Sequence, residues 1–330
     1  MTKRALILGV TGQDGSHLAD FLLTKDYEVH GLVRKSATGN LINIQHLLDD
    51  PAVSEKRFFT HHGDLSDPTS LYRVIATVQP HELYNEADQD HVRWSYEMVG
   101  YSSDITAAAV GRVLEIIKQL DPNIRFFQPC SSNMYGVSNL DYQDESTPFN
   151  PQSPYAVAKT FAYYMTRYYR QAFGLHASTA IFFNHESSRR TPEYVTRKIT
   201  QSVARIAVGR QAQLVLGDLS AEIDWGYAGD YMEAAWQIAQ RETPDDFVIA
   251  TGEAHSVREF VDEAFAVVGL DPARYVTTSA AFMRPGKTST LKGDTRKAKQ
   301  AFGFDAKVRF SQLVRLMVEA DLQKEGSDID

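Results

Sequence analysis

Residues 4–15 read RALILGVTGQDG, an apolar run that enters a loop with glycines at positions 9, 12 and 15. This G-x-x-G-x-x-G spacing, between an expected strand and an expected helix, is typical of a turn that binds a dinucleotide. Gly9 and Gly12 let the backbone approach a pyrophosphate at the positive end of the helix, and Gly15 permits close packing. The strand–helix context disfavours the alternative of an ordinary glycine turn. The predicted cofactor residues of this turn are Gly9, Thr11, Gly12, Gln13 and Asp14.

Apolar runs alternate with amphipathic helical stretches along most of the chain. The alternation predicts an α/β fold, a Rossmann-type doubly wound parallel sheet with a smaller C-terminal substrate lobe. The expected strands are Arg4–Leu8, Val29–Val33, Arg57–Thr60, Glu82–Asn85, Ile124–Gln128, Ala177–Phe183 and Phe247–Thr251. The expected helices include Ser16–Thr24, Leu71–Val78 and Ala107–Gln119. We expect residues 1–183 with about 225–252 to form the Rossmann domain, and 184–224 with 253–330 to form the substrate lobe.

Composition restricts the class of protein. The formal net charge of −8 over 330 residues argues against a nucleic-acid partner. A single cysteine, Cys130, allows no intrachain disulfide and favours a reducing, cytoplasmic compartment. The apolar run at the N-terminus is too short to span a bilayer, so we expect neither a signal peptide nor a membrane anchor. No metal site is predicted.

The end of the second expected strand indicates which dinucleotide binds. NAD enzymes usually carry Asp or Glu there, to bond the ribose 2′-hydroxyl. This chain instead has Arg34, which can pair with a 2′-phosphate, and Ser36, which can add a hydrogen bond. The pattern favours NADP over NAD, with a solvated basic turn as the alternative. Asp64 and Leu65, after the third strand, are expected to hold the adenine edge.

Tyr155 and Lys159 form a Tyr-x-x-x-Lys pair, whose spacing places both side chains on one helical face. Free tyrosine has a pKa near ~10, and a neighbouring ammonium together with the nicotinamide charge favours the phenolate. Tyr155 can then take a proton from a sugar hydroxyl as hydride leaves, while Lys159 bonds the nicotinamide ribose. Ser131 follows a strand end and can share that proton. Cys130 beside it could be a nucleophile, but a small structural residue is the simpler interpretation.

Several longer stretches carry a resemblance to a known family: GVTGQDGSHLADFLL, PFNPQSPYAVAK, FFNHES-RR, VTRKIT, DWGYAGDY and DDFVIATGEAHSVREF. Together they resemble the GDP-mannose 4,6-dehydratase family over nearly the whole chain. The resemblance implies a Rossmann lobe with bound NADP, a C-terminal lobe that binds a GDP-linked nucleotide sugar, and catalysis by Ser131, Tyr155 and Lys159. The further cofactor contacts that it implies are Glu86, Ala87, Asp88, Tyr101, His185 and Arg190. The substrate contacts that it implies are Asp88, Gln89, Asp90, Asn184, Lys198 and Arg284.

One departure from the family concerns the catalytic residues. The family has Ser-Thr-Ser-Glu where this chain has Cys130-Ser131-Ser132-Asn133. The family's glutamate removes the C5 proton before water leaves from C6, and the amide of Asn133 cannot act as that base. We therefore expect oxidation at C4 to proceed and elimination to stall. A neutral Ser-x-x triplet here looks like the sugar 4-epimerases of the extended short-chain dehydrogenase/reductase superfamily, so a GDP-sugar 4-epimerase is the leading hypothesis.

A second departure adds charge beside the sugar. The family's Asn-Leu-Ala-Ala-Gln-Ser is here Asn85-Glu86-Ala87-Asp88-Gln89-Asp90, which suggests a different, more hydroxylated sugar. Asp88 could also replace the missing base. A third departure is Ile223, at the position of a phosphate-binding arginine. Arg284 remains, with Lys287 near it, so guanine stays the expected base.

Three alternatives remain open. The first is a true 4,6-dehydratase whose base has moved to Asp88 or Asp90. The second is a 4-ketosugar reductase that consumes NADPH, and the third is a non-catalytic NADP-binding protein, against which the retained catalytic residues argue. We expect a homodimer or homotetramer. The loop Ala37–Leu41 has lost much of the family's polar pattern, which disfavours a cofactor contact between subunits.

Overall fold

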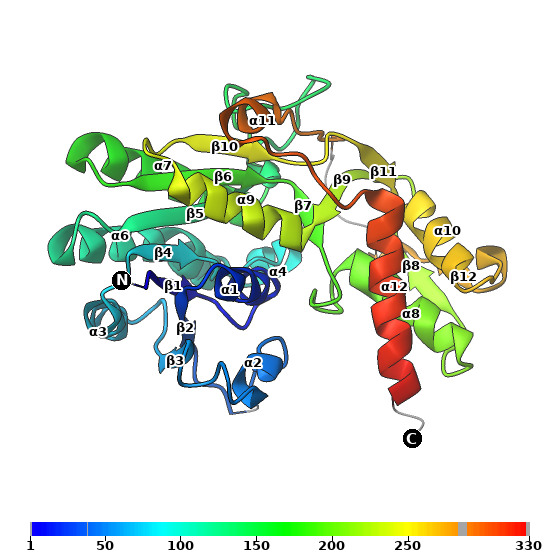
Figure 1. Ribbon diagram of the computed structural model, residues 1–330. Coiled ribbons are helices and arrows are strands. Elements are labelled where there is room, and N and C mark those ends of the chain that lie inside the picture. The colour runs from blue at the N-terminus through cyan, green and yellow to red at the C-terminus, as the bar shows by residue number, and fades with distance from the viewer. Residues whose placement is uncertain (1, 38, 283–288, 328–330) are drawn as a thin grey trace.

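The computed structural model describes residues 2–37, 39–282 and 289–327. Its centre is a seven-stranded parallel sheet in the order β10-β6-β5-β4-β1-β2-β3 (Figure 1). The strands are β1 (Arg4–Leu8), β2 (Glu28–Val33), β3 (Phe58–His62), β4 (Glu82–Asn85), β5 (Arg125–Ser131), β6 (Ala177–Phe182) and β10 (Asp246–Ile249). The predicted α/β class and Rossmann-type sheet are confirmed, and every expected strand is present within three residues of its expected ends. Successive strands are added to one side of β1 as far as β3 and to its other side from β4 onwards, and such sheets bind ligands at this switch point between β1 and β4.

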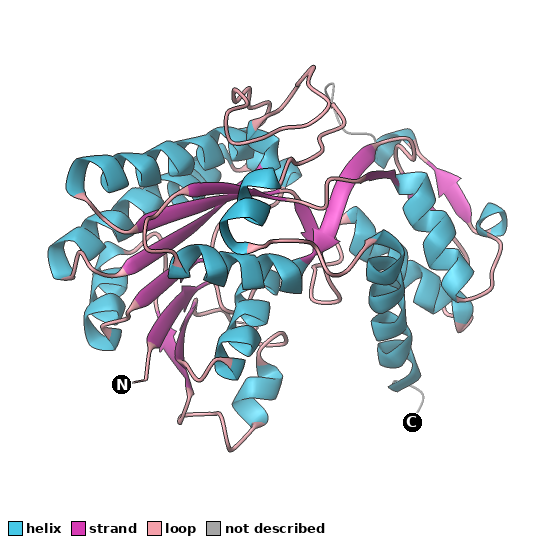
Figure 2. Ribbon diagram, turned by 45° about the horizontal axis from the view of Figure 1, so that its top comes forward, coloured by secondary structure: helices cyan, strands magenta, loops and turns pink. Residues whose placement is uncertain are grey.

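Helices cover both faces of this sheet (Figure 2). Alternate residues of β1 face opposite ways, so that Ala5 and Ile7 join one hydrophobic core while Leu6 and Leu8 join the other. Burial on both faces explains why this strand reads as a continuous apolar run. The first core is covered by α1 (Gln13–Thr24), α2 (Gln45–Asp49), α9 (Ala228–Gln240) and α11 (Arg296–Phe302). The second is covered by α3 (Pro68–Val78), α6 (Ala109–Leu120) and α7 (Pro154–Phe173).

Local sequence determines where α7 begins and ends. The Ser153 side chain accepts a hydrogen bond from the Ala156 N–H, and Pro154 occupies the first helical turn. Both features are favoured at a helix N-terminus. Gly174 ends the helix with a positive φ of 68°. The helix expected over Ala107–Gln119 differs more: a π-helical turn over Ser103–Ala108 precedes α6 and follows the short helices α4 (Val92–Glu97) and α5 (Val99–Ser102).

The smaller lobe has its own hydrophobic core. It contains the strands β7 (Asn184–Glu186), β8 (Leu214–Leu216), β9 (Glu222–Tyr227), β11 (Ala254–Ser256) and β12 (Val276–Thr278), and the helices α8 (Val195–Ala207), α10 (Val257–Val267) and α12 (Phe310–Ser327). A buried ion pair between Arg197 and Asp321 joins α8 to α12, and Thr200 Oγ1 donates to the same carboxylate at 2.8 Å. The chain also crosses back between lobes, because Ala298, Phe304 and Ala306 pack into the core beside α1 and α9.

Asp224 on β9 connects distant segments of the chain. Its buried carboxylate accepts hydrogen bonds from the Thr251 N–H at 2.9 Å and hydroxyl at 2.6 Å, and from the N–H groups of Gly252 (2.9 Å) and Gly293 (3.2 Å). Burial raises the pKa of Asp224, which these donors partly offset. The carboxylate thus fixes the path that the chain takes after β10 and again before α11.

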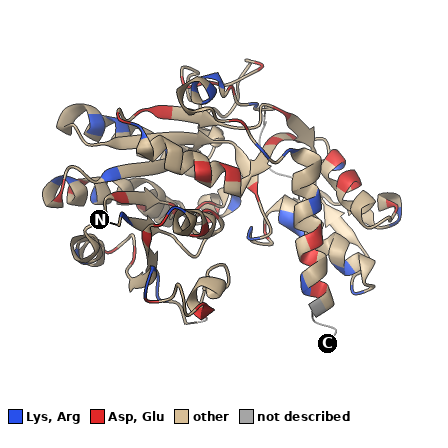
Figure 3. Ribbon diagram, in the orientation of Figure 1, with Lys and Arg blue, Asp and Glu red and all other residues tan. Residues whose placement is uncertain are grey.

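Positions of acidic and basic residues are interspersed along the ribbon of both lobes (Figure 3). In the described part of the chain, no helix combines the length and the apolarity needed to cross a bilayer. The same residues contain no cluster of His, Cys, Asp and Glu side chains that could hold a metal ion.

Candidate active site

The glycine turn between β1 and α1 is packed too closely for side chains. Gly9 has a φ of +80°, and a Cβ atom there would lie 2.6 Å from the carbonyl oxygen of Glu86 and 2.8 Å from the Ala87 Cα. A Cβ on Gly15 would lie 2.3 Å from the Gly9 oxygen. The turn therefore requires glycine, and it lies directly against the loop that follows β4. Gly12 caps α1 without a capping side chain, so the first turn can receive an anion.

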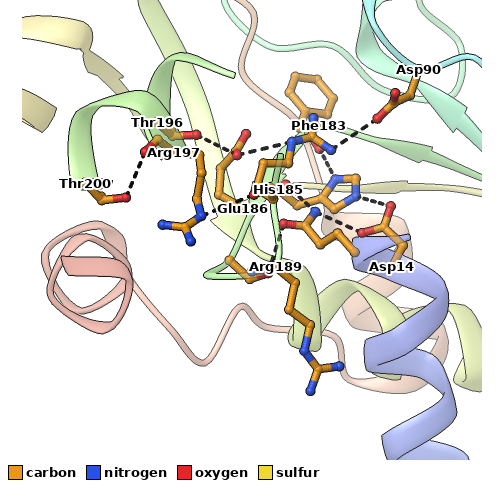
Figure 4. Close-up of polar contacts among 12 residues, drawn as sticks. Asp14, Asp90, Phe183, His185, Glu186, Arg189, Thr196, Arg197 and Thr200 are labelled. Atoms are coloured by element: carbon orange, nitrogen blue, oxygen red, sulfur yellow. Dashed lines mark hydrogen bonds and ion pairs between the residues drawn. The ribbon is translucent and has the colours of Figure 1, made fainter. Parts of the chain in front are cut away.

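The first turn of α1 is joined to β7 by a hydrogen-bond network (Figure 4). His185 Nε2 lies 2.9 Å from the Asp14 carboxylate, and its Nδ1 lies 2.8 Å from the Phe183 carbonyl oxygen. Burial alone would raise the pKa of Asp14, but the charge and hydrogen bond of His185 lower it well below its usual range. Gln13 donates to the His185 carbonyl at 3.1 Å and accepts from Ser187 at 2.9 Å. Three residues expected at the cofactor, Gln13, Asp14 and His185, therefore lie together.

Arg190 lies beside the same network. Its guanidinium stacks on the Tyr194 ring, 3.6 Å from the ring centroid, and lies 3.4 Å from the Glu186 carboxylate. A second carboxylate, that of Asp90, lies 3.5 Å away. Two predicted site residues, Arg190 and Asp90, therefore form an ion pair at the boundary between the lobes.

The predicted catalytic residues meet at the carboxyl end of β5. Tyr155 and Lys159 lie on the buried face of α7, and Ser131 is the last residue of β5. Burial raises the pKa of Tyr155, while the Lys159 ammonium and a hydrogen bond with Ser131 act in the opposite direction. Asn133 donates to the Ser131 hydroxyl oxygen through its side-chain amide at 3.1 Å and its backbone N–H at 3.2 Å. The amide of Asn133 therefore lies within this group of predicted catalytic residues.

Lys159 is held by two oxygen atoms. Its ammonium donates to the Pro129 carbonyl at 2.9 Å and lies 2.6 Å from the Asp88 carboxylate. Burial would lower the pKa of Lys159, but Asp88 raises it above its usual value, so the lysine is charged. Asp88 is one of the three carboxylates that the sequence places in this loop.

The expected adenine end is more open. The Arg34 guanidinium is exposed and donates to the Tyr101 hydroxyl at 3.3 Å. This hydrogen bond connects two predicted cofactor residues. Ser36 is also exposed. The Asp64 carboxylate accepts from the Ser66 N–H at 2.9 Å, and buried Leu65 accepts from Arg112 through its carbonyl at 3.1 Å.

Two predicted substrate residues have partners within the protein. Buried Gln89 accepts a hydrogen bond from Ser102 at 2.7 Å, and Lys198 donates to the Val215 carbonyl at 2.7 Å while lying over an aromatic ring. Asn184 is half-buried at the start of β7. The prediction for Arg284, and the comparison with Lys287, lie outside the described residues.

Some residues of the site were not predicted from the sequence. Tyr231 stacks on His185 with ring centroids 4.8 Å apart, and Asn43 donates to the Thr11 carbonyl at 3.1 Å. Tyr231 ends the stretch DWGYAGDY that carries the resemblance, but nothing in that stretch pointed to a contact with His185, and Asn43 belongs to no recognisable motif. Cys130 is buried and its pKa is raised by burial to about 12, which disfavours the nucleophile hypothesis.

Known structures share this architecture. A dTDP-glucose 4,6-dehydratase from Streptomyces venezuelae superimposes with a TM-score of 0.86 at 23% identity, covering 98% of both chains. A UDP-glucose 4-epimerase from Thermus thermophilus gives 0.82 at 24% identity, covering 96% of this chain and 98% of that one. At these identities the similarity establishes the fold. The fold is that of the extended short-chain dehydrogenase/reductases, and it places Tyr155 and Lys159 on one helix, α7.

Sequence relatives identify the family. The family model described as GDP-mannose 4,6 dehydratase matches residues 6–317. GDP-mannose 4,6 dehydratase 1 of Arabidopsis thaliana is 46% identical over 326 residues, which span 97% of this chain and 90% of that one. The Homo sapiens GDP-mannose 4,6 dehydratase is 43% identical over 97% of this chain and 91% of its own length. This chain belongs to the GDP-mannose 4,6-dehydratase family, which confirms the resemblance seen in the sequence.

Proposed function

We propose that this protein is an NADP-dependent enzyme that transiently oxidises the C4 hydroxyl of a GDP-linked sugar, and that it acts as a 4-epimerase. The observation that carries the proposal is the amide of Asn133, which hydrogen-bonds to Ser131 at the position of the family's glutamate. The residues for hydroxyl oxidation are complete, whereas the residue for elimination is replaced.

The residues around the site fit a nicotinamide dinucleotide. A pyrophosphate fits beside Gly9 and Gly12, which carry no side chain, and at the first turn of α1, which has no capping side chain. Exposed Arg34 beside Tyr101 fits a ribose 2′-phosphate, and no acid occupies that position, which supports NADP over NAD. When bound, the nicotinamide would supply the hydride acceptor.

The protein's own groups can manage the proton. The Lys159 ammonium favours the phenolate form of Tyr155, which accepts the proton of the sugar hydroxyl and becomes the neutral phenol. The Ser131 hydroxyl lies within reach of Tyr155 and holds the substrate oxygen in place. Asn133 keeps that hydroxyl oriented but cannot remove a carbon-bound proton, because an amide does not titrate in this range.

A true 4,6-dehydratase is the second candidate, favoured by one specific observation. Asp88 brings a carboxylate to within 2.6 Å of Lys159, at the catalytic group itself, and could replace the missing base. The names of the relatives agree with this reaction. Its pairing opposes this role, because the carboxylate is already bound to the Lys159 ammonium, which lowers the pKa of Asp88 although burial raises it overall.

The test is product analysis after incubation with GDP-mannose and a panel of other GDP-sugars in heavy water. We expect a product of unchanged mass, with a new chromatographic position and no deuterium. Loss of one water with one deuterium gained would establish the dehydratase instead. Stoichiometric consumption of NADPH would indicate the 4-ketosugar reductase, and tight NADP binding without any product would indicate a non-catalytic protein.

An exposed face of the chain supports a homodimer. Val157, Phe161, Tyr164 and Tyr168 are each between 44% and 56% exposed and line the outer face of α7. The neighbouring helices α4 and α5 add Trp94, Tyr96, Met98, Val99 and Tyr101. A contiguous apolar surface of this kind is typical of a subunit interface, and two-fold assemblies are the commonest. We name the surface formed by these residues of α7, α4 and α5 the α7 patch. A tetramer and a cytoplasmic location stay predictions.

A further inference from the structure

Glu86 is an unusual residue in this site. Both of its carboxyl oxygens are buried, and neither has a hydrogen-bond partner among the residues that the structure describes. The residue directly follows β4, and its own carbonyl oxygen is the atom that a Cβ on Gly9 would strike. A polar group buried without a partner is costly, so such a group calls for an explanation.

The charged groups around the carboxyl group place Glu86 within the expected cofactor site. The charged groups that act on it are Asp14 on α1, Lys159 on α7 and Asp88 in its own loop, with the Tyr84 hydroxyl on β4 also coupled to it. Asp14 belongs to the turn that fits a pyrophosphate, and Lys159 belongs to the catalytic group. Glu86 therefore lies between the diphosphate end and the nicotinamide end of the expected cofactor.

The charges nearby determine which protonation state of Glu86 is compatible with a bound diphosphate. An ionised glutamate would repel a diphosphate, and Asp14 and Asp88 already place two carboxylates nearby. Lys159, the one cation acting on Glu86 in this set, is paired with Asp88 at 2.6 Å. Burial, with Asp14 and Asp88, raises the pKa of Glu86 well above its usual range, and Lys159 offsets only part of this. A protonated carboxyl group, in contrast, is a hydrogen-bond donor.

We propose that Glu86 is a cofactor-binding residue that acts as a neutral carboxylic acid, donating a hydrogen bond to an oxygen of the dinucleotide's diphosphate–ribose bridge. The inference rests on the proposed function, because it requires that a nicotinamide dinucleotide binds in this site. Its consequence is that cofactor binding is linked to a proton on Glu86. When the free protein has lost that proton, binding must take one up from solvent.

The test compares three variants by isothermal titration calorimetry with NADP⁺, from pH 5.5 to 9. Glu86→Gln keeps an N–H donor of the same length but does not titrate, whereas Glu86→Leu removes the donor. Glu242→Gln, at an exposed position before β10, controls for the loss of one negative charge. The melting temperature of each free variant verifies that it is folded. The 2′-phosphate also titrates, near about pH 6, but it does so equally for every variant.

We expect the ratio of the wild-type Kd to that of Glu86→Gln to rise with pH, by up to about tenfold per pH unit once Glu86 ionises in the free protein. At high pH the wild type should take up close to one proton more than Glu86→Gln, measured from binding heats in buffers of different ionisation enthalpy. Glu86→Leu should bind roughly tenfold more weakly than Glu86→Gln. Glu242→Gln should follow the wild type.

Equal affinity of the Leu and Gln variants for NADP⁺ would overturn the inference alone, and a Kd ratio that is constant across this pH range would overturn the uptake of a proton on binding. A wild-type protein that binds no NADP⁺ at any pH would overturn the proposed function as well. The two failures are distinguishable, because in the first case the wild type still binds the dinucleotide.

Discussion

The Lys159 ammonium and the Asp88 carboxylate form an ion pair of 2.6 Å at the centre of the catalytic group. Tyr155 depends on that ammonium, since Lys159 is the main group that favours its phenolate. Asp88 acts in the opposite direction and raises the pKa of Tyr155. In the free protein the Asp88 carboxylate therefore disfavours the phenolate form of Tyr155, which is the proposed base.

Asp88→Asn should relieve that restraint. The change removes the charge but keeps the shape, so the pKa of Tyr155 falls and the rise of kcat with pH moves to lower pH, by about one unit. The measurement is the pH–rate profile with saturating sugar and cofactor. Asp26→Asn is the control, because that side chain is 98% exposed. An unchanged profile would contradict the effect of Asp88 on Tyr155, and complete loss of turnover would instead indicate that Asp88 is needed as a catalytic base.

Asn133→Glu should restore elimination. The new carboxylate would lie two residues after Ser131, at the position of the family's base, and could remove the C5 proton. The expected product is a GDP-sugar that has lost one water, detected by mass spectrometry. Asn133→Gln is the matched control, with the length of glutamate and no ionisable group. If the wild type already yields the dehydrated sugar, the assignment of Asn133 as the limiting residue is wrong.

Tyr155→Phe should lower kcat by roughly 10²–10⁴-fold, because it removes the group that accepts the substrate proton. The affinity for the GDP-sugar should change far less, and the buried ring is retained. Tyr164→Phe on the exposed face of the same helix is the control. Steady-state kinetics with a separate measurement of sugar binding would check this prediction. Loss of sugar binding comparable to the loss of rate would contradict the catalytic role.

Glu86→Gln should also change how stability depends on pH. The folded protein raises the pKa of Glu86 above its usual value of 4.5. The neutral form is therefore favoured by folding, and its contribution is complete below that value and is lost as pH rises toward the folded pKa. Relative to Glu86→Gln, the wild type should lose up to about 1.4 kcal/mol of unfolding free energy per pH unit in this window. Urea unfolding of the free proteins at several pH values measures this difference. If the unfolding free energies of the two proteins change equally with pH, Glu86 is not a buried acid with a raised pKa.

Glutamates on the α7 patch should separate the proposed dimer. Val157→Glu with Tyr164→Glu places two charges in a surface that would otherwise be buried between subunits. Sedimentation velocity should show a shift from dimer to monomer at micromolar concentration. Tyr72→Glu, on an exposed tyrosine of α3, should leave the assembly unchanged. A wild type that sediments as a monomer would rule out this interface.

Much of the fold followed from the sequence because its signals are local. The glycine spacing at residues 9–15 is explained by close packing, since Gly9 and Gly15 leave no space for a Cβ. The spacing of Tyr155 and Lys159 sufficed to place both on the buried face of α7. Each of these signals depends only on backbone geometry within a few residues.

Pairing between distant side chains could not be predicted in the same way. The sequence showed three added carboxylates after β4 but not that Asp88 pairs with Lys159 or that Glu86 has no partner among the described residues. The hydrogen bond from Lys198 to the Val215 carbonyl was not predicted either. Arg197 and Asp321 pair although 124 positions separate them. Which distant side chains pair depends on how the two lobes pack together, and no local sequence pattern predicts that packing.

The hydrogen bonds of Asp224 affect when parts of the chain can finish folding during synthesis. Its carboxylate accepts a hydrogen bond from Gly293, which is synthesised 69 residues later. At ordinary translation rates this separation corresponds to on the order of ten seconds. During that interval β9 carries an acid that lacks part of its hydrogen bonding. The boundary between the lobes can therefore be completed only near the end of synthesis, after most of the Rossmann sheet has emerged.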